Sequence, residues 1–339
     1  NSRRNSGPNE KLRIANIFRM MNPLVSICIT TYNHNDYILQ AVNSVLMQKV
    51  TFAFEILLGE DDSTDGTKEK CIELARKYPD RIRLFLNNRS EVIHINGRPT
   101  GRFNFLNNLK NAKGKYIALL DGDDYWTDPF KLQKSIDFLE KNDAYSFTFH
   151  NCGIEEDGIM KSDFLNENTP PSIDLVYLAA NGNCMRTLSV VFRNNFENIF
   201  LEWLKQTPVA DFPIHVHNAS IGKGKYFSET LGVYRKHAGG IWSTYKNAEM
   251  KMEWLVMIEE MSTHYPILNN PAVWQNQLAE VSFSIGRLFE REKDVRSAVY
   301  FEKSERYSPN RYRELSNVKL NEKKKKANPI FLFFKRIFK

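Results

Sequence analysis

The chain has 339 residues, of which 42% are hydrophobic and 26% charged, with 16 glycines and 13 prolines. This balance is typical of a globular protein and excludes collagen-like, coiled-coil and disordered chains. The net charge of +7 comes from the two ends, because residues 1–22 carry five Arg or Lys against one Glu, and residues 322–339 carry seven against one. The part between them is mildly acidic, so we expect no nucleic-acid partner.

Four cysteines, at positions 28, 71, 152 and 184, are too far apart for the spacing of a zinc finger. Cys28 stands in an apolar run, which favours a buried, reduced thiol and a reducing compartment. No apolar run approaches the roughly 20 residues of a membrane-spanning helix, and no signal peptide is apparent. We therefore expect a chain that is soluble or lies on a membrane surface.

Short apolar strands alternate with amphipathic helices over the first 134 residues. The pattern predicts strands at 24–30, 54–59, 82–86 and 115–120, and helices at 36–47, 67–78 and 101–112. Such alternation favours a mostly parallel sheet with helices on both faces. Sheets of this kind bind ligands beyond the carboxyl ends of their strands. We expect the site there, where polar residues follow the first, second and fourth strands.

The second half of the chain has a mixed pattern. We predict strands at 146–151, 188–192 and 226–234, which extend the same sheet, and helices at 196–204 and 213–220. Three amphipathic helices follow at 248–264, 271–291 and 294–307. The last two approach the spacing of a tetratricopeptide pair, but we favour an ordinary antiparallel pair. The expected divisions are a basic extension (1–22), a main domain (23–245), a helical region (246–321) and a basic tail (322–339).

Carboxylates gather directly after the fourth predicted strand. Asp121, Asp123 and Asp124 repel one another unless a cation neutralises them, and hard oxygen ligands suit Mn²⁺ or Mg²⁺, ions that also bind phosphate oxygens. Asp128 is instead assigned to an N-cap of the helix that follows Pro129. The sequence therefore predicts a divalent-metal site at this strand end.

A second acidic cluster, Glu60-Asp61-Asp62, lies beside the first if the second and fourth strands flank the first strand. Acidic side chains do not contact phosphate directly, but they can accept hydrogen bonds from a nucleobase imide or a ribose hydroxyl. Asp61 is the member that we expect to make such a contact.

Four blocks of this sequence, in the same order, resemble the family 2 glycosyltransferases, inverting enzymes with the A-type nucleotide-sugar (GT-A) fold. The blocks are Val25–Asn33, Glu60–Thr67, Ala112–Asp124 and Tyr234–Ser243. The resemblance implies a Rossmann-like α/β fold with a mostly parallel central sheet and added C-terminal helices. It makes the main domain (23–245) the catalytic domain.

The resemblance also assigns roles on the donor side. It implies that Thr31, Tyr32 and Asp61 line the nucleoside pocket. Asp121 and Asp123 would form the DxD element that contacts the ribose and the metal on the diphosphate, with Asp124 sharing the metal. Aligned on Ser63, the chain has Asp62 where many relatives have glycine, so Asp62 remains an alternative contact to the base.

An inverting transfer needs a carboxylate that deprotonates the attacking hydroxyl. In the family this group ends a Glu-Asp pair at the start of a helix. The best match is Asp211, which lacks the preceding Glu and could also be an N-cap ahead of Pro213. Arg235 and His237 follow a predicted strand and could stabilise charge on the leaving group, and a neutral His237 could also bind the metal.

The remaining candidates are weaker. Arg98 and Arg102 could reach the diphosphate or be solvated loop positions, and Trp242 could stack on a sugar or pack in the core. Residues 222–225 lack the spacing of a phosphate loop, and His215 and His217 would lie on different faces of one helix, which argues against zinc.

The tail has Ile and Phe side chains on one helical face at 330, 331, 334, 337 and 338, next to Lys335, Arg336 and Lys339. This pattern predicts binding to an anionic membrane surface. A packed terminal helix or a disordered tail is the alternative.

Together these observations predict a metal-dependent inverting hexosyl- or N-acetylhexosaminyltransferase of polysaccharide biosynthesis. It would use Mn²⁺ or Mg²⁺ and a nucleoside-diphosphate sugar, UDP-linked, to extend a cell-surface or lipid-linked glycan. We expect it in the cytoplasm, peripheral on the inner face of the plasma membrane. The alternatives are a sugar-nucleotide pyrophosphorylase, disfavoured because Thr31–His34 lacks glycine, and an inactive glycan- or partner-binding module on the same fold.

Overall fold

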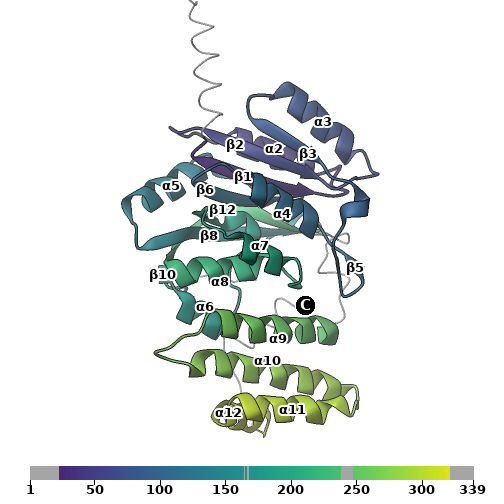
Figure 1. Cartoon of the computed structure of the whole chain (residues 1–339), viewed down its shortest axis with the longest axis vertical. Coiled ribbons are helices and arrows are strands. Elements are labelled where there is room, and N and C mark those ends of the chain that lie inside the picture. Colours follow the sequence, from purple (N-terminus) through teal and green to yellow (C-terminus); the bar gives the residue numbers. More distant parts are fainter. Residues whose placement is uncertain (1–22, 164, 166–167, 238–246, 321–339) are drawn as a thin grey trace, which may run out of the picture. The chain divides into compact units, whose positions relative to one another are not determined.

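The computed structural model describes residues 23–163, 165, 168–237 and 247–320 (Figure 1). Contacts within the chain divide it into two compact units, which we describe separately. The first comprises the chain up to Pro171 together with Met185–Gln206 and Gly224–Lys236, and the second comprises Ser172–Cys184, Thr207–Lys223 and the described residues from His237 onward. The predicted boundary between the main domain (23–245) and the helical region (246–321) stays a prediction.

The first unit is built on one sheet with strand order β12-β8-β11-β6-β1-β2-β3, to which β9 adds on β8 and β7 on β12. Strands β3, β2, β1 and β6 are parallel, and β11 joins β6 and β8 antiparallel. The bounds are β1 (Val25–Thr31), β2 (Phe54–Glu60), β3 (Ile82–Leu86), β6 (Tyr116–Asp121), β7 (Tyr125–Trp126), β8 (Tyr145–Glu156), β9 (Ile159–Ser162), β11 (Val191–Arg193) and β12 (Lys223–Lys236).

This strand order has a consequence for the site. The second and fourth predicted strands, β2 and β6, do flank β1 (Figure 1). Their carboxyl ends therefore meet at one edge of the sheet, where the two acidic clusters are expected. The later strands extend the same sheet, as predicted.

Helices and short elements connect these strands. They are α2 (Ile38–Leu46), α3 (Thr67–Lys77), the 3-10 turn η1 (Arg89–Glu91), the hairpin of β4 (His94–Ile95) and β5 (Arg98–Pro99), α4 (Arg102–Asn111), α5 (Lys131–Lys141), the 3-10 turn η2 (Thr187–Ser189) and α7 (Asn198–Leu204). Helix α4 packs against β1 and β2, α3 against β2 and β3, and α5 against β8.

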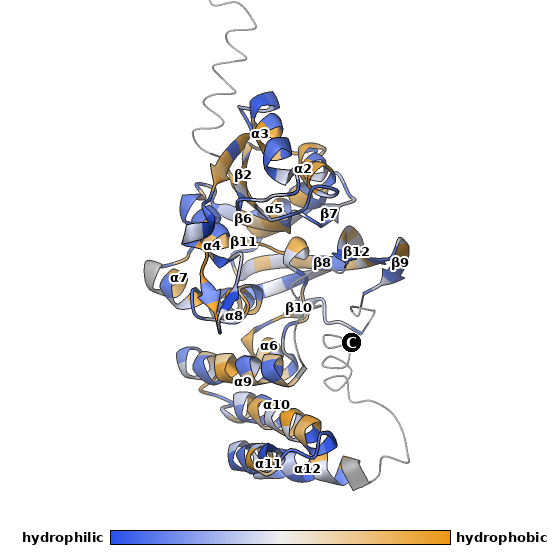
Figure 2. Ribbon diagram, turned by 90° about the vertical axis from the view of Figure 1, so that its right-hand side faces the viewer, coloured by the Kyte–Doolittle hydropathy of each residue, from blue (hydrophilic) through white to orange (hydrophobic). Residues whose placement is uncertain are grey.

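Strands β1 and β2 are buried on both faces, which explains their nearly continuous apolar sequences. Strand β2 is orange over much of its length in Figure 2, whereas α3 shows many blue residues. Helix α4 approaches closely at Gly59, where an added Cβ would lie 1.7 Å from Asn104 Oδ1. Asn104 and Asn108 donate to the carbonyls of Gly59 and Ile29 at 2.8 and 2.9 Å. These bonds fix the helix over the strand ends that carry the site.

All four cysteines are buried and free. Burial raises the pKa of Cys71 and of Cys184 to about 12. The thiols are therefore protonated and unreactive in the folded chain.

Two local predictions were wrong in detail. The predicted strand at 188–192 is a 3-10 turn followed by β11, because the backbone N–H of Ser189 bonds to the carbonyl of Arg186. Asp128 does not take the N-cap position of α5, which Phe130 occupies. Its carboxylate instead accepts the N–H of Phe130 at 2.6 Å, in the turn before the helix.

The second unit is mostly helical, with β10 (Ser172–Ile173), α6 (Leu175–Asn181), α8 (Asp211–Ile221), α9 (Asn247–His264), α10 (Ala272–Arg291), α11 (Arg296–Tyr307) and α12 (Pro309–Leu320). Phe212 of α8 stacks on Trp254 of α9 with ring centres 5.1 Å apart. Gly286 of α10 admits the ring of Phe301 from α11, since an added Cβ would lie 2.8 Å from that ring. Helices α6 and α12 were not predicted from the sequence.

In the described part of the chain, no helix combines the length and the apolar character needed to cross a bilayer. The predicted N-terminal extension, Trp242 and the amphipathic tail lie outside the described residues.

Candidate active site

The acidic motif Asp121–Asp124 begins at the last residue of β6 and is tied to the end of β1. Asp121 lies opposite Thr30 in the parallel register, and Thr30 Oγ1 donates to Asp121 Oδ1 at 2.9 Å. The N–H of Gly122 bonds to the carbonyl of Thr30 at 2.8 Å. The motif therefore turns away from the sheet directly above the loop that follows β1.

Asp123 lies beside two imidazoles. His34 Nε2 is 3.7 Å from Asp123 Oδ2, and one ligand atom each from His34, Asp123 and His237 lies within 4.8 Å of the others. All three side chains are partly buried. Two imidazole nitrogens and a carboxylate oxygen are suitable donors for a divalent transition ion. The chemistry of these residues fits a divalent metal; Asp123 and His237 were predicted as its ligands, whereas His34 was not.

The position of His237 follows from the end of β12, to which it is directly bonded. Arg235 N–H donates to Asp124 Oδ1 at 2.8 Å, and Arg235 Nη1 donates to the carbonyl of Asp123 at 2.7 Å. The guanidinium also pairs with Glu155 at 3.3 Å. These hydrogen bonds join the end of β12 to the acidic motif. The predicted contact of Arg235 with the diphosphate stays a prediction.

Asp124 has a different environment from Asp123. Its side chain has no exposed surface, and in the described structure its Oδ2 has no hydrogen-bond partner. Burial raises the pKa of Asp124 well above its ordinary value, and the charges of Asp123 and Asp121 raise it further. Asp124 lies outside the cluster of His34, Asp123 and His237, so its role as a metal ligand stays a prediction.

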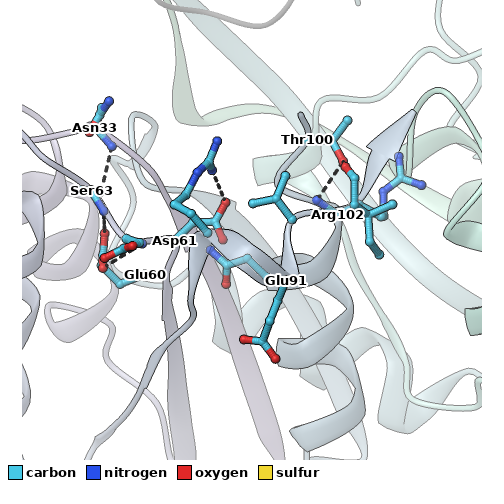
Figure 3. A network of polar contacts seen from close by, with 12 residues as sticks. Asn33, Glu60, Asp61, Ser63, Glu91, Thr100 and Arg102 are labelled. Carbon is cyan, nitrogen blue, oxygen red and sulfur yellow. Dashed lines mark hydrogen bonds and ion pairs between the residues drawn. The ribbon is translucent and has the colours of Figure 1, made fainter. Parts of the chain in front are cut away.

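Asp61 follows β2 at the same edge of the sheet. It is 1% exposed, and its Oδ2 accepts from Arg89 Nη1 at 2.9 Å, an ion pair drawn in Figure 3. Its buried Oδ1 has no hydrogen-bond partner in the part of the chain that the structure describes. Burial raises the pKa of Asp61, and the Arg89 charge opposes that rise. A carboxylate oxygen held in this way can accept one N–H from a ligand.

An aromatic ring lies next to this carboxylate. Tyr32 is 39% exposed, and the Arg89 guanidinium carbon is 4.3 Å from the centre of its ring. Thr31, the last residue of β1, accepts the N–H of Asp61 on its carbonyl at 3.1 Å. Its buried Oγ1 has no hydrogen-bond partner among the described residues. The structure therefore brings Thr31, Tyr32 and Asp61 together, and their role in a nucleoside pocket stays a prediction.

The loop after β2 distinguishes Asp61 from Asp62. Glu60 accepts the N–H of Asp62 at 3.1 Å and that of Ser63 at 2.7 Å, while Ser63 Oγ accepts the N–H of Asn33 (Figure 3). Asp62 has a positive φ of 60°, a conformation that glycine adopts easily. Its carboxylate pairs with Lys68 at 2.8 Å, and that lysine lowers its pKa. This conformation agrees with the alignment that places Asp62 at the position of the usual glycine.

Asp211 belongs to the second unit, where it is the first residue of α8. The N-cap is Ala210, so the predicted N-cap role of Asp211 was wrong. Asn183 Nδ2 donates to Asp211 Oδ2 at 2.8 Å, and Asn183 Oδ1 lies 3.1 Å from His215 Nδ1. Burial lowers the pKa of His215 to about 4, so this imidazole is neutral near pH 7.

Three other candidate residues, Arg102, His215 and His217, have structural partners. Arg102 is buried at the start of α4 and its Nη1 donates to the carbonyl of Leu204. His217 Nδ1 lies 3.1 Å from the hydroxyl of Tyr265, whereas His215 faces Asn183. The two histidines have different neighbours, as expected for different helix faces.

The sequence is similar to those of known proteins. A family model described as glycosyl transferase family 2 matches residues 26–200. An uncharacterized protein of Mycobacterium tuberculosis is 34% identical over 223 residues, which is 64% of this chain and 60% of that protein. The Escherichia coli protein UDP-Glc:alpha-D-GlcNAc-diphosphoundecaprenol beta-1,3-glucosyltransferase WfaP is 31% identical over 220 residues, 64% of this chain and 79% of WfaP.

The fold also has a solved counterpart. The crystal structure of S. aureus TarS 1-349 in complex with UDP-GlcNAc matches with a TM-score of 0.52 at 14% identity, over 88% of this chain and 92% of that one. This similarity confirms the predicted GT-A fold. Because the family model covers slightly more than half of the sequence, the chain belongs to glycosyl transferase family 2.

Proposed function

We propose that this chain is a metal-dependent inverting glycosyltransferase that transfers a sugar from a UDP-sugar to a hydroxyl of a lipid-linked or cell-surface glycan. The observation that carries the proposal is the cluster of His34, Asp123 and His237 at the same sheet edge as Asp61 and Tyr32. His34, Asp123 and His237 suit a metal bound to a diphosphate, whereas Asp61 and Tyr32 suit a nucleobase. The name of WfaP, a UDP-glucose transferase with a diphosphoundecaprenol-linked acceptor, supports the donor and acceptor classes.

On the donor side, the chain binds and orients the nucleotide. Tyr32 offers a ring face for stacking on the base, and Asp61 Oδ1 accepts the imide N–H of a uracil. Asp121 is placed to accept from a ribose hydroxyl, with His34, Asp123 and His237 holding the ion. When bound, the metal neutralises negative charge on the diphosphate, which makes the diphosphate a better leaving group.

On the acceptor side, Asp211 is the proposed general base. The hydroxyl oxygen forms a bond to the anomeric carbon from the face opposite the diphosphate, and its proton passes to Asp211. The bond between the anomeric carbon and the diphosphate oxygen breaks, and its electron pair leaves with the nucleoside diphosphate. The hydrogen bond from Asn183 orients the carboxylate for this proton transfer.

A lipid-linked acceptor would also give the basic tail, residues 322–339, a role. We place the reaction at the cytoplasmic surface of the membrane, where lysines and aromatic side chains of residues 322–339 would hold the enzyme near a lipid-linked glycan. Removing this segment should abolish co-sedimentation with anionic vesicles without changing turnover of a soluble acceptor. Equal co-sedimentation of the two chains would contradict the tail's role.

The test of the activity is release of nucleoside diphosphate from a panel of nucleotide sugars, with Mn²⁺, with Mg²⁺ and with chelator. We expect turnover that favours UDP-sugars, requires the metal, and is lost in Asp123→Asn. Asp137→Asn, an exposed acid on α5, is the matched control and should retain full activity. The inactive-module alternative predicts no release with any donor and no metal-dependent thermal stabilisation by UDP.

A further inference from the structure

We propose that His34 is a direct metal ligand, so that the site holds its ion with two imidazole nitrogens and one carboxylate and prefers Mn²⁺ to Mg²⁺. This inference deepens the proposed function and rests on its metal site. His34 lies in the loop after β1, distant in sequence from the acidic motif.

The spacing of the three donors fits a single ion. Metal–nitrogen and metal–oxygen bonds of about 2.1 Å separate neighbouring ligand atoms by about 3 Å and opposite ones by about 4.2 Å. His34 Nε2 and Asp123 Oδ2 are 3.7 Å apart, and all three ligand atoms lie within 4.8 Å of one another. Small side-chain rotations therefore suffice for one ion to contact all three.

The backbone of His34 is fixed on both sides. On one side, the Asn33 N–H donates to Ser63 Oγ at 2.9 Å, and Asn33 Oδ1 accepts the N–H of Thr64 at 3.0 Å. On the other, the carbonyl of His34 accepts the N–H groups of Tyr37 and Ile38 at 3.0 and 2.9 Å, where α2 begins. A ligand held by such contacts is preorganised before the ion arrives.

The acidic motif leaves room for this imidazole at Gly122. A Cβ at that position would lie 2.9 Å from His34 Nδ1 and 2.6 Å from Thr31 Oγ1. The absence of a side chain between Asp121 and Asp123 therefore lets the ring lie directly against the motif. His34 and the motif fit together as parts of one site.

The donor set determines the metal preference. Carboxylate oxygen and water suit Mg²⁺, whereas imidazole nitrogen suits transition ions. A site with two nitrogens should bind Mn²⁺, Co²⁺ or Zn²⁺ more tightly than Mg²⁺. Three ligands already in place should also bind Mn²⁺ without nucleotide.

The experiment is a Mn²⁺ titration of the full chain without nucleotide, followed by the electron paramagnetic resonance signal of the free ion, with Mg²⁺ as competitor. We expect His34→Asn to weaken Mn²⁺ binding by about tenfold or more. His34→Asp, which replaces nitrogen by oxygen, should shift the Mn²⁺ to Mg²⁺ affinity ratio toward Mg²⁺. His94→Asn, at an exposed histidine of β4, is the control and should bind Mn²⁺ as the wild type does.

The outcomes separate this inference from the proposed function. If His34→Asn binds Mn²⁺ like the wild type while Asp123→Asn does not, His34 is no ligand but the proposed metal site stands. Absence of wild-type binding without nucleotide also overturns the inference, because preplaced ligands do not need the diphosphate. If Asp123→Asn binds as tightly as the wild type, the metal site in the proposed function is itself wrong.

Discussion

Replacing Gly122 by alanine inserts one methyl group between the acidic motif and the loop after β1. The new Cβ would lie 2.6 Å from Thr31 Oγ1, 2.7 Å from Thr31 Cβ and 2.9 Å from His34 Nδ1. Ordinary contacts begin at 3.4 Å, so the loop or the motif must move by about 0.8 Å. The change leaves every charged and metal-binding side chain in the sequence intact.

The size of the effect follows from that displacement. Overpacking of this kind costs about 1–3 kcal/mol of folding free energy. A misplacement of about 1 Å among groups that hold a substrate can lower a rate by about 100-fold. We therefore expect Gly122→Ala to remain folded, to unfold at a lower temperature, and to lose about two orders of magnitude in turnover.

The assay measures donor turnover and Mn²⁺ affinity in parallel with thermal unfolding. Gly101→Ala is the matched control, because an added Cβ there meets no atom within 4 Å and the residue has an ordinary negative φ of −73°. Gly101→Ala should keep the wild-type turnover, and its unfolding temperature should lie within a few degrees of that of the wild type. Wild-type turnover and Mn²⁺ affinity in Gly122→Ala would refute the close packing of the loop on the motif.

Three further predictions concern single side chains. Asp211→Asn should retain UDP binding but lower turnover by about 10²- to 10⁴-fold, the range for a general base; single-turnover kinetics with unchanged rates would exclude Asp211 as the base. Asp61→Asn should weaken UDP binding in calorimetry by about tenfold or more, because an amide replaces the carboxylate that pairs with Arg89 and accepts from the base, whereas Asp62→Asn should not; stronger loss of binding in Asp62→Asn than in Asp61→Asn would make Asp62 the base contact. Lys131 is fully buried with its Nζ 3.7 Å from the centre of the Trp126 ring, and burial lowers its pKa well below the ordinary value. The unfolded chain therefore binds this proton more tightly, and stability should rise with pH until about 10.4. Lys131→Met should raise stability at pH 7 by about 1–3 kcal/mol and flatten that pH dependence in denaturant titrations. A lower denaturation midpoint at pH 7 would contradict the cost assigned to the buried amine.

The parallel half of the fold could be predicted because its signals are local. The strands at Val25–Thr31 and Phe54–Glu60 are apolar throughout, since helices cover both faces, and the polar residues that end them mark the carboxyl edge. Strand order then brings Asp61 and the acidic motif to the same edge. These inferences need only the hydrophobic periodicity of the sequence and the rule that parallel sheets bind ligands beyond the carboxyl ends of their strands.

The rest depends on contacts between distant segments. His34 has no motif of its own, and its membership of the cluster follows from the turn at Asn33 and from the space at Gly122. The order β6, β1, β2 brings the loop after β1 next to the motif after β6, but it does not say which side chain of that loop contacts the motif. The alternative role of Asp211 as an N-cap rested on Pro213, but α8 begins at Asp211 itself, and the carboxylate accepts a hydrogen bond from Asn183 instead.

The two units are interleaved along the chain, which crosses between them after residues 171, 184, 206, 223 and 236. A single cut in the chain, for example after residue 245, would therefore not separate one unit from the other. It would keep α8 while removing Trp254, the aromatic partner of Phe212. A shortened chain would thus expose an apolar ring to water and invite aggregation, so a loss of activity on truncation there would say nothing about catalysis.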